Sequence, residues 1–204
     1  MTFPPPSKKI IQGHILAGGR ASRMQGEDKG LLTLSGKPLL EHVLERLSSQ
    51  VATIYISANR QPQQYQAYGW PVIGDNLEGF LGPLAGIQAA LLACECEWLL
   101  TVPVDCPFIP EDLLQRLSQA VITTNRPLAV VHDGKGLQPT FCLLHQSLAE
   151  SLQHYLQQGG RKTGEWLRQQ EPALADYSDK PDAFININTP EDLELAEQRL
   201  RHAG

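Results

Sequence analysis

The first half of the chain alternates between short apolar runs and an amphipathic stretch. Residues 9–16 (KIIQGHIL) form an apolar run that predicts a strand, and residues 38–50 (PLLEHVLERLSSQ) repeat apolar positions at helical spacing. The runs at 51–57 (VATIYIS) and 70–75 (WPVIGD) are typical of buried parallel strands. The apolar face expected on the helix consists of Leu39, Leu40, Val43, Leu44 and Leu47.

The second half continues the alternation and adds one hairpin. Its expected elements are a helix at 81–95 with Pro83 in the first turn, a strand at 97–105, a helix at 109–121, paired strands at 128–134 and 137–144, a helix at 146–158, a strand at 183–188 (AFININ) and a helix at 189–203. No repeat and no linker divides the chain. We therefore expect a single domain over residues 1–204, an α/β fold with three layers, α/β/α, around a mostly parallel, Rossmann-like sheet.

Such sheets bind ligands beyond the carboxyl ends of their strands. Three polar segments follow predicted strands here: the loop after Leu16, the turn at Asp105 and the turn at residues 186–190. A purely structural turn does not require these polar residues. This edge of the sheet is therefore the expected site.

Composition narrows the class of protein. The chain has 204 residues, enough for one domain with a substantial core, and a net charge of -5, which argues against a general nucleic-acid or membrane binder. Prolines occupy positions 4–6, where a signal peptide would be apolar, and no run approaches the length of a membrane span. We expect a cytoplasmic protein with a disordered tail at residues 1–8. The four cysteines lack zinc spacing and are interpreted as free thiols.

The loop in HILAGGRASRMQGEDKG combines glycines with Arg20, Arg23 and Lys29. It is neither a P-loop nor a dinucleotide fingerprint. Glycines let backbone N–H groups approach a phosphate, and the cations can neutralise a triphosphate. The alternative is a loop of turn-forming glycines and solvated arginines, which the residues alone leave open.

Several motifs occur in an order that resembles one family. They are LAGGRASRM, DKGLL, GKPLLEHVLERL, SANR, GPLAGIQAAL, PVDCPFIP and NINTPEDL. This combination is similar to the molybdenum cofactor guanylyltransferases, which belong to the nucleotidyltransferases that make nucleotide sugars. The similarity extends from Ile11 to the C-terminal helix and implies a sheet of the nucleotide-diphospho-sugar transferase type.

The resemblance implies a reaction in which the phosphate of molybdopterin, or of its molybdenum-containing form, attacks the α-phosphorus of GTP. Pyrophosphate leaves, and molybdopterin guanine dinucleotide forms. The attacking phosphate is already ionised, so catalysis needs alignment and charge stabilisation rather than a side-chain nucleophile. The implied cofactor is Mg²⁺, and the implied partners include cofactor-inserting proteins and chaperones specific to molybdoenzymes.

The motifs also assign residues to these roles. Arg23, Lys29 and Asp105 are the expected catalytic residues. The expected nucleotide-binding residues are Leu16, Ala17, Gly18, Gly19, Lys29, Ser57, Asp75, Gly82, Pro83 and Asp105. Asp105 ends an apolar strand, where a carboxylate can hold Mg²⁺ between phosphates.

The pterin side of the site is expected to involve Asn186, Asn188, Arg161 and Lys162, with Asn188 also assisting the metal. Solvated loop residues are an equal alternative for the two basic positions. Thr189, Pro190 and Asp192 match the start of a helix and need no further role. Two positions depart from many family members: Gln25 replaces a glycine and Ser57 replaces an asparagine.

Two other functions stay open. One is a cytidylyl- or sugar-nucleotidyltransferase of the same fold, although such relatives usually have LAAG where this chain has LAGG. The other is a catalytically silent nucleotide-binding regulator. Retention of Arg23, Lys29 and Asp105 together argues against the regulator.

Overall fold

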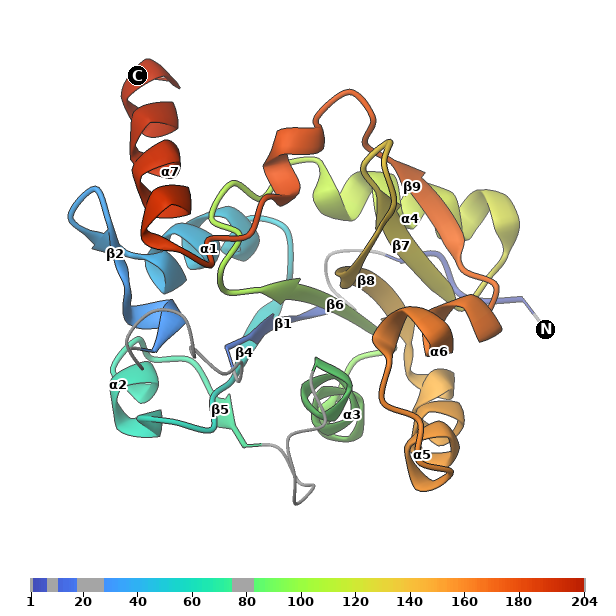
Figure 1. Ribbon diagram of the computed structural model, residues 1–204. Coiled ribbons are helices and arrows are strands. Elements are labelled where there is room, and N and C mark those ends of the chain that lie inside the picture. The colour runs from blue at the N-terminus through green and yellow to red at the C-terminus, as the bar shows by residue number, and fades with distance from the viewer. Residues whose placement is uncertain (1, 7–10, 18–27, 75–82, 204) are drawn as a thin grey trace.

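The computed structural model describes residues 2–6, 11–17, 28–74 and 83–203. Within these ranges a seven-stranded sheet forms the centre of the molecule (Figure 1). The strands, in spatial order, are β5 (Val72–Ile73), β4 (Thr53–Ser57), β1 (Ile11–Leu16), β6 (Trp98–Pro103), β8 (Leu137–His145), β7 (Leu128–His132) and β9 (Ala173–Asp176). Neighbours pair in parallel except around β8, which runs antiparallel to both β6 and β7. The expected mostly parallel sheet is confirmed.

Helices cover both faces of this sheet (Figure 1). The helices are α1 (Leu39–Ser48), α2 (Pro62–Gln66), α3 (Pro83–Ala93), α4 (Leu113–Thr124), α5 (Ala149–Gln157), α6 (Thr163–Gln169) and α7 (Pro190–Ala203). α1 and α4 share one apolar core with the sheet, whereas α3, α5 and α6 share the other. The five apolar positions predicted for the face of α1 are all buried. The three-layer prediction is therefore confirmed.

A small hairpin, β2 (Thr33–Leu34) and β3 (Lys37–Pro38), carries the C-terminal helix. Leu34 and Leu39 form a separate apolar cluster with Ile187 and Ala196, so α7 packs on the hairpin rather than on the sheet. α7 stands at the end of the molecule opposite the N-terminus (Figure 1). Because Ile187 belongs to this cluster, the hairpin also holds the segment just before α7.

The predicted strand at residues 183–188 is wrong. Ala183 and Phe184 instead end a short 3₁₀ helix, η4 (Pro181–Phe184), and residues 185–188 pair with no strand. Both edges of β6 are already occupied, by β1 and β8, so no ladder is available beside it. Just beyond the end of β6, the N–H of Ile187 donates a backbone hydrogen bond to the carbonyl of Asp105 at 2.8 Å.

Part of the expected disordered tail, residues 2–6, contacts the core, whereas residues 1, 7 and 8 lie outside the described ranges. Phe3 packs edge-on against Trp98 and His145, with ring centroids 6.4 and 5.2 Å apart. The indole N–H of Trp98 donates to the carbonyl of Pro4 at 3.1 Å. Residues 2–6 are therefore held against the core by an aromatic side chain.

Candidate active site

The carboxyl ends of β4, β1 and β6 lie next to one another. Leu16 is in register with Ser57 on one side and with Pro103 on the other. Beyond these pairs, the N–H of Ala17 donates to the carbonyl of Ser57 at 2.9 Å, and the N–H of Val104 donates to Leu16 at 3.1 Å. The segments predicted to bind nucleotide and metal therefore meet at one edge of the sheet.

Three side chains that are distant in the sequence converge beyond that edge. The Nζ of Lys29 donates to Oδ2 of Asp105 at 2.8 Å and to Oδ1 of Asn188 at 2.5 Å. The side chains of Lys29 and Asp105 are 17% and 12% exposed, so this ion pair is mostly covered. The sequence predicted that these residues belong to one site, and the structure brings all three together.

A buried carboxylate fixes the backbone at Lys29. Asp28 caps the 3₁₀ turn η2 (Lys29–Leu31), and its Oδ1 accepts the N–H of Gly30 at 3.2 Å. The same oxygen accepts a hydrogen bond from the hydroxyl of Tyr65, which is fully buried in α2. A Cβ at position 30 would overlap this hydroxyl, so the chain needs glycine there. Asp28 and Tyr65 were missed by the sequence analysis, because no motif links residues 37 positions apart.

The start of α7 fixes Asn188. One carboxylate oxygen of Asp192 accepts the N–H groups of both Asn188 and Thr189 at 2.9 Å. These backbone bonds lower the pKa of Asp192, the bond from Asn188 having the larger effect. The hydroxyl of Thr189 accepts the N–H of Asp192 in return, at 3.2 Å. The predicted helix start is confirmed, and it places the amide of Asn188 beside Lys29.

Asn186 contacts the residue next to Asp105 and not Lys29 itself. Its Oδ1 lies 2.7 Å from the Sγ of Cys106, the residue after Asp105. Burial raises the pKa of Cys106 well above its usual value, so the thiol keeps its proton and donates to the amide. Asn186 itself is exposed. Its predicted contact with the pterin remains a prediction.

Ser57 forms a buried pair with a histidine. Its Oγ lies 2.7 Å from the Nε2 of His14, which is completely buried on β1. Burial lowers the pKa of His14 to about 3, so the ring is neutral at ordinary pH. Among the residues that the structure describes, the Nδ1 of His14 has no hydrogen-bond partner. No sequence motif links His14 with Ser57, which lies 43 residues further along the chain.

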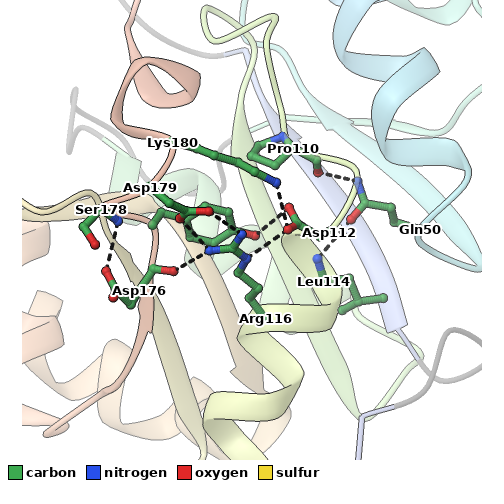
Figure 2. Close-up of polar contacts among 10 residues, drawn as sticks. Gln50, Pro110, Asp112, Leu114, Arg116, Asp176, Ser178, Asp179 and Lys180 are labelled. Carbon is green, nitrogen blue, oxygen red and sulfur yellow. Dashed lines mark hydrogen bonds and ion pairs between the residues drawn. The ribbon is translucent and has the colours of Figure 1, made fainter.

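A second polar cluster anchors the segment after β9, from which the chain continues to Asn188. Figure 2 shows Arg116 of α4 between Asp112 and Asp179. Both guanidinium Nη atoms donate to Asp179, at 2.7 and 2.8 Å, and Lys180 pairs with Asp112 at 2.9 Å. The guanidinium also lies 4.4 Å from the ring centroid of Tyr177. This cluster ties the segment after β9 to α4, upstream of η4 and Asn188.

The oxygen atoms of the site suit a hard divalent cation. The Lys29 ammonium shows that the carboxylate of Asp105 and the amide oxygen of Asn188 can face one positive charge together. Mg²⁺ binds proteins through one or two carboxylates and takes further oxygens from water and phosphates. Within the described residues no group of three or more His, Cys, Asp or Glu could hold a metal. The donor set therefore fits a cation that shares its coordination with a phosphate ligand.

Comparison with known proteins assigns the chain to a family. The model of the MobA-like NTP transferase domain matches residues 13–173. A molybdenum cofactor guanylyltransferase from Photobacterium profundum is 45% identical over 195 residues, which cover 96% of this chain and 100% of that protein. The protein of the same name from Pasteurella multocida is 48% identical over 180 residues, covering 88% of this chain and 95% of its own.

This chain belongs to the molybdenum cofactor guanylyltransferase family. The family's nucleotidyltransferase fold is confirmed by a solved structure, the molybdopterin-guanine dinucleotide biosynthesis protein A from Archaeoglobus fulgidus. That structure superimposes with a TM-score of 0.79 at 25% identity and covers 94% of this chain and 99% of its own.

Membership of this guanylyltransferase family does not establish the roles of several individual residues, which stay predictions. Arg161 donates to the carbonyls of Leu156 and Gly160, and Lys162 pairs with Glu165. These contacts are local to the α5–α6 connection and do not link the two basic residues to Asp105. Pro83 begins α3 as predicted and is exposed. The other predicted site residues lie outside the described ranges; they are Gly18, Gly19, Arg23, Asp75 and Gly82.

None of the helices in the described ranges combines the length and apolar character that a membrane span requires.

Proposed function

We propose that this chain transfers the guanylyl group of GTP to the phosphate of molybdopterin, with or without molybdenum. An oxygen of the pterin phosphate forms a bond to the α-phosphorus, the bond from that phosphorus to the β-phosphate oxygen breaks, and pyrophosphate leaves. The observation that carries the proposal is the convergence of Lys29, Asp105 and Asn188 beyond β1 and β6. A site that places a cation and two oxygen donors together suits triphosphate chemistry.

The residues of the chain have distinct parts in this proposal. The ammonium of Lys29 neutralises the phosphate oxygens of GTP, and the backbone at Leu16 and Ala17 lies beside the nucleotide. Asp105 and Asn188 hold Mg²⁺, which when bound neutralises charge on the phosphates. The fixed backbones at Lys29 and Asn188 reduce the reorganisation needed to reach an aligned complex. Arg23 completes the proposed charge set.

The relatives' names specify guanylyl transfer and the molybdenum cofactor, which supports GTP and molybdopterin as the substrates here. The rivals are cytidylyl or sugar-nucleotidyl transfer on the same fold and a silent nucleotide binder. We extend the proposal to the proteins that insert the cofactor and to chaperones specific to molybdoenzymes, since a bound dinucleotide product must be passed on.

One experiment separates the three functions. The protein is incubated with Mg²⁺ and each nucleoside triphosphate in turn, with molybdopterin, with a sugar phosphate or without an acceptor, and both triphosphate binding and released pyrophosphate are measured. Guanylyl transfer predicts pyrophosphate only with GTP and molybdopterin together. Release with CTP or with a sugar phosphate supports the first rival, and binding of a triphosphate without release under any condition supports the silent binder.

A further inference from the structure

Lys29 lies where a metal held by Asp105 and Asn188 would have to bind. Its Nζ is 2.8 Å from one oxygen of Asp105 and 2.5 Å from the amide oxygen of Asn188. These are the same two oxygens that the donor chemistry assigns to a divalent cation. In this structure both oxygens therefore face a positive charge.

The two oxygen donors are fixed more firmly than the lysine. The carbonyl of Asp105 accepts the N–H of Ile187 at 2.8 Å, which joins the strand end directly to the segment that carries Asn188. The N–H of Asn188 is in turn bound to the carboxylate of Asp192. The ammonium of Lys29, by contrast, sits at the end of a flexible four-carbon side chain. The backbone at position 29 is anchored through Asp28, so the ammonium can swing while its own main chain stays in place.

A divalent cation and an ammonium cannot share this position. The ammonium uses the lone pairs that the metal needs, and two cations a few ångströms apart in a mostly covered site repel each other strongly. Phosphate oxygens would offer the ammonium alternative acceptors of equal or higher charge. They would also supply the additional oxygens that a metal with only two protein donors requires.

We propose that Lys29 closes the metal position in the free protein and opens it when a triphosphate takes over its ammonium. Metal and nucleotide then bind as one unit, and each raises the affinity for the other by the same factor. This inference rests on the proposed function only in assuming that a triphosphate is the anion. The guanine base and the pterin acceptor do not enter it.

The test measures metal binding without catalysis. Mn²⁺ is titrated into the full-length protein, and free Mn²⁺ is followed by electron paramagnetic resonance. The wild-type protein should bind Mn²⁺ alone weakly, and Lys29→Met should bind it at least tenfold more tightly. The control Lys37→Met removes a lysine that is paired with Glu45 away from this site and should bind Mn²⁺ as the wild type does. Addition of Asp105→Asn to Lys29→Met should abolish the gain.

Equal Mn²⁺ affinity of the wild type and Lys29→Met would overturn the proposal, as would a gain that survives Asp105→Asn. Lys29→Gln, with a thermal melt of each protein, provides a second variant in case Lys29→Met does not fold. In a final arm, GTP added to the wild type should raise Mn²⁺ affinity at least tenfold, after subtraction of the Mn²⁺ that GTP binds in a protein-free blank, and no rise would overturn the proposal. If guanylyl transfer itself were the wrong reaction, the arm without nucleotide would still give the predicted difference, so the two failures are distinguishable.

Discussion

The hydroxyl of Tyr65 donates a hydrogen bond to the carboxylate of Asp28, the residue immediately before Lys29. Burial and the neighbouring carboxylate raise the pKa of Tyr65, so the phenol keeps its proton and remains a donor. A core residue of α2 thereby holds the turn from which the site lysine extends. Buried carboxylates are costly unless their oxygens are satisfied, which makes this contact important for the turn.

Tyr65→Phe should therefore weaken both the fold and the reaction. The variant leaves Asp28 with a buried oxygen short of one donor, which costs about 1–3 kcal/mol in the free energy of unfolding. Turnover at saturating substrate should fall roughly tenfold, about 1.4 kcal/mol, because Lys29 is held less accurately. Denaturant unfolding and steady-state kinetics measure the two effects. Tyr68→Phe, at the neighbouring half-buried tyrosine, is the matched control and should keep wild-type turnover. Wild-type turnover in Tyr65→Phe would show that the hydrogen bond does not position Lys29.

The base preference is a separate prediction. We expect GTP to bind at least about tenfold more tightly than ATP or CTP, a difference of about 1.4 kcal/mol. The reason is that polar groups arranged for one base are left unpaired when another base binds. Isothermal titration calorimetry with each triphosphate checks this. Equal affinities would contradict guanylyl transfer and favour a sugar-nucleotide reaction.

The buried, neutral His14 should make the folded protein less stable in mild acid. Its pKa is about 3 in the folded protein, against 6.5 for an ordinary histidine, because burial disfavours the charged ring. Between these two values the unfolded chain binds a proton that the folded chain does not, so stability is retained above pH 6.5 and falls as the pH drops below it. From pH 7 to pH 5 the loss attributable to His14 should be about 2 kcal/mol.

Unfolding free energies measured at several pH values test the assignment to His14. His14→Gln removes the titrating ring and should give a shallower dependence on pH between 5 and 7. His202→Gln, at an exposed histidine of α7, should keep the wild-type slope. Identical slopes in His14→Gln and the wild type would mean that another group controls this range.

The sequence predicts the sheet well because its strands are buried and their apolar runs are continuous. It also predicts that the loop before Lys29, the strand end at Asp105 and the segment at Asn188 share one site, since carboxyl ends of parallel strands lie at one edge. The α6 helix and β9 were missed because they are short, with 7 and 4 residues. The hairpin β2–β3 carries a turn signal that the pattern analysis did not use, Ser35–Gly36, with positive φ angles of 50° and 81°.

The sequence does not predict which side chains pair between segments that are far apart in the chain. Asp28 and Tyr65, or His14 and Ser57, are brought together by packing between segments that no local pattern connects. The direct contact of Lys29 with the expected metal ligands was likewise not predicted, because motifs assign residues to a site without giving their arrangement. The wrong strand at 183–188 has the same origin, since an alternating apolar pattern does not reveal that both edges of β6 are occupied.

The most direct test of the account is single-turnover guanylyl transfer by Asp105→Asn across a titration of Mg²⁺, with a thermal melt of the same variant. The substitution keeps the shape of the side chain and removes the charge that pairs with Lys29. We expect turnover to fall about a hundredfold or more, roughly 3 kcal/mol of barrier. The variant should melt cooperatively at a lower temperature, because a mostly covered ion pair is lost while the amide of Asn188 still accepts from Lys29. Wild-type turnover at ordinary Mg²⁺, or a lost activity that is matched by a collapsed melt, would contradict the assignment of Asp105 to the reaction.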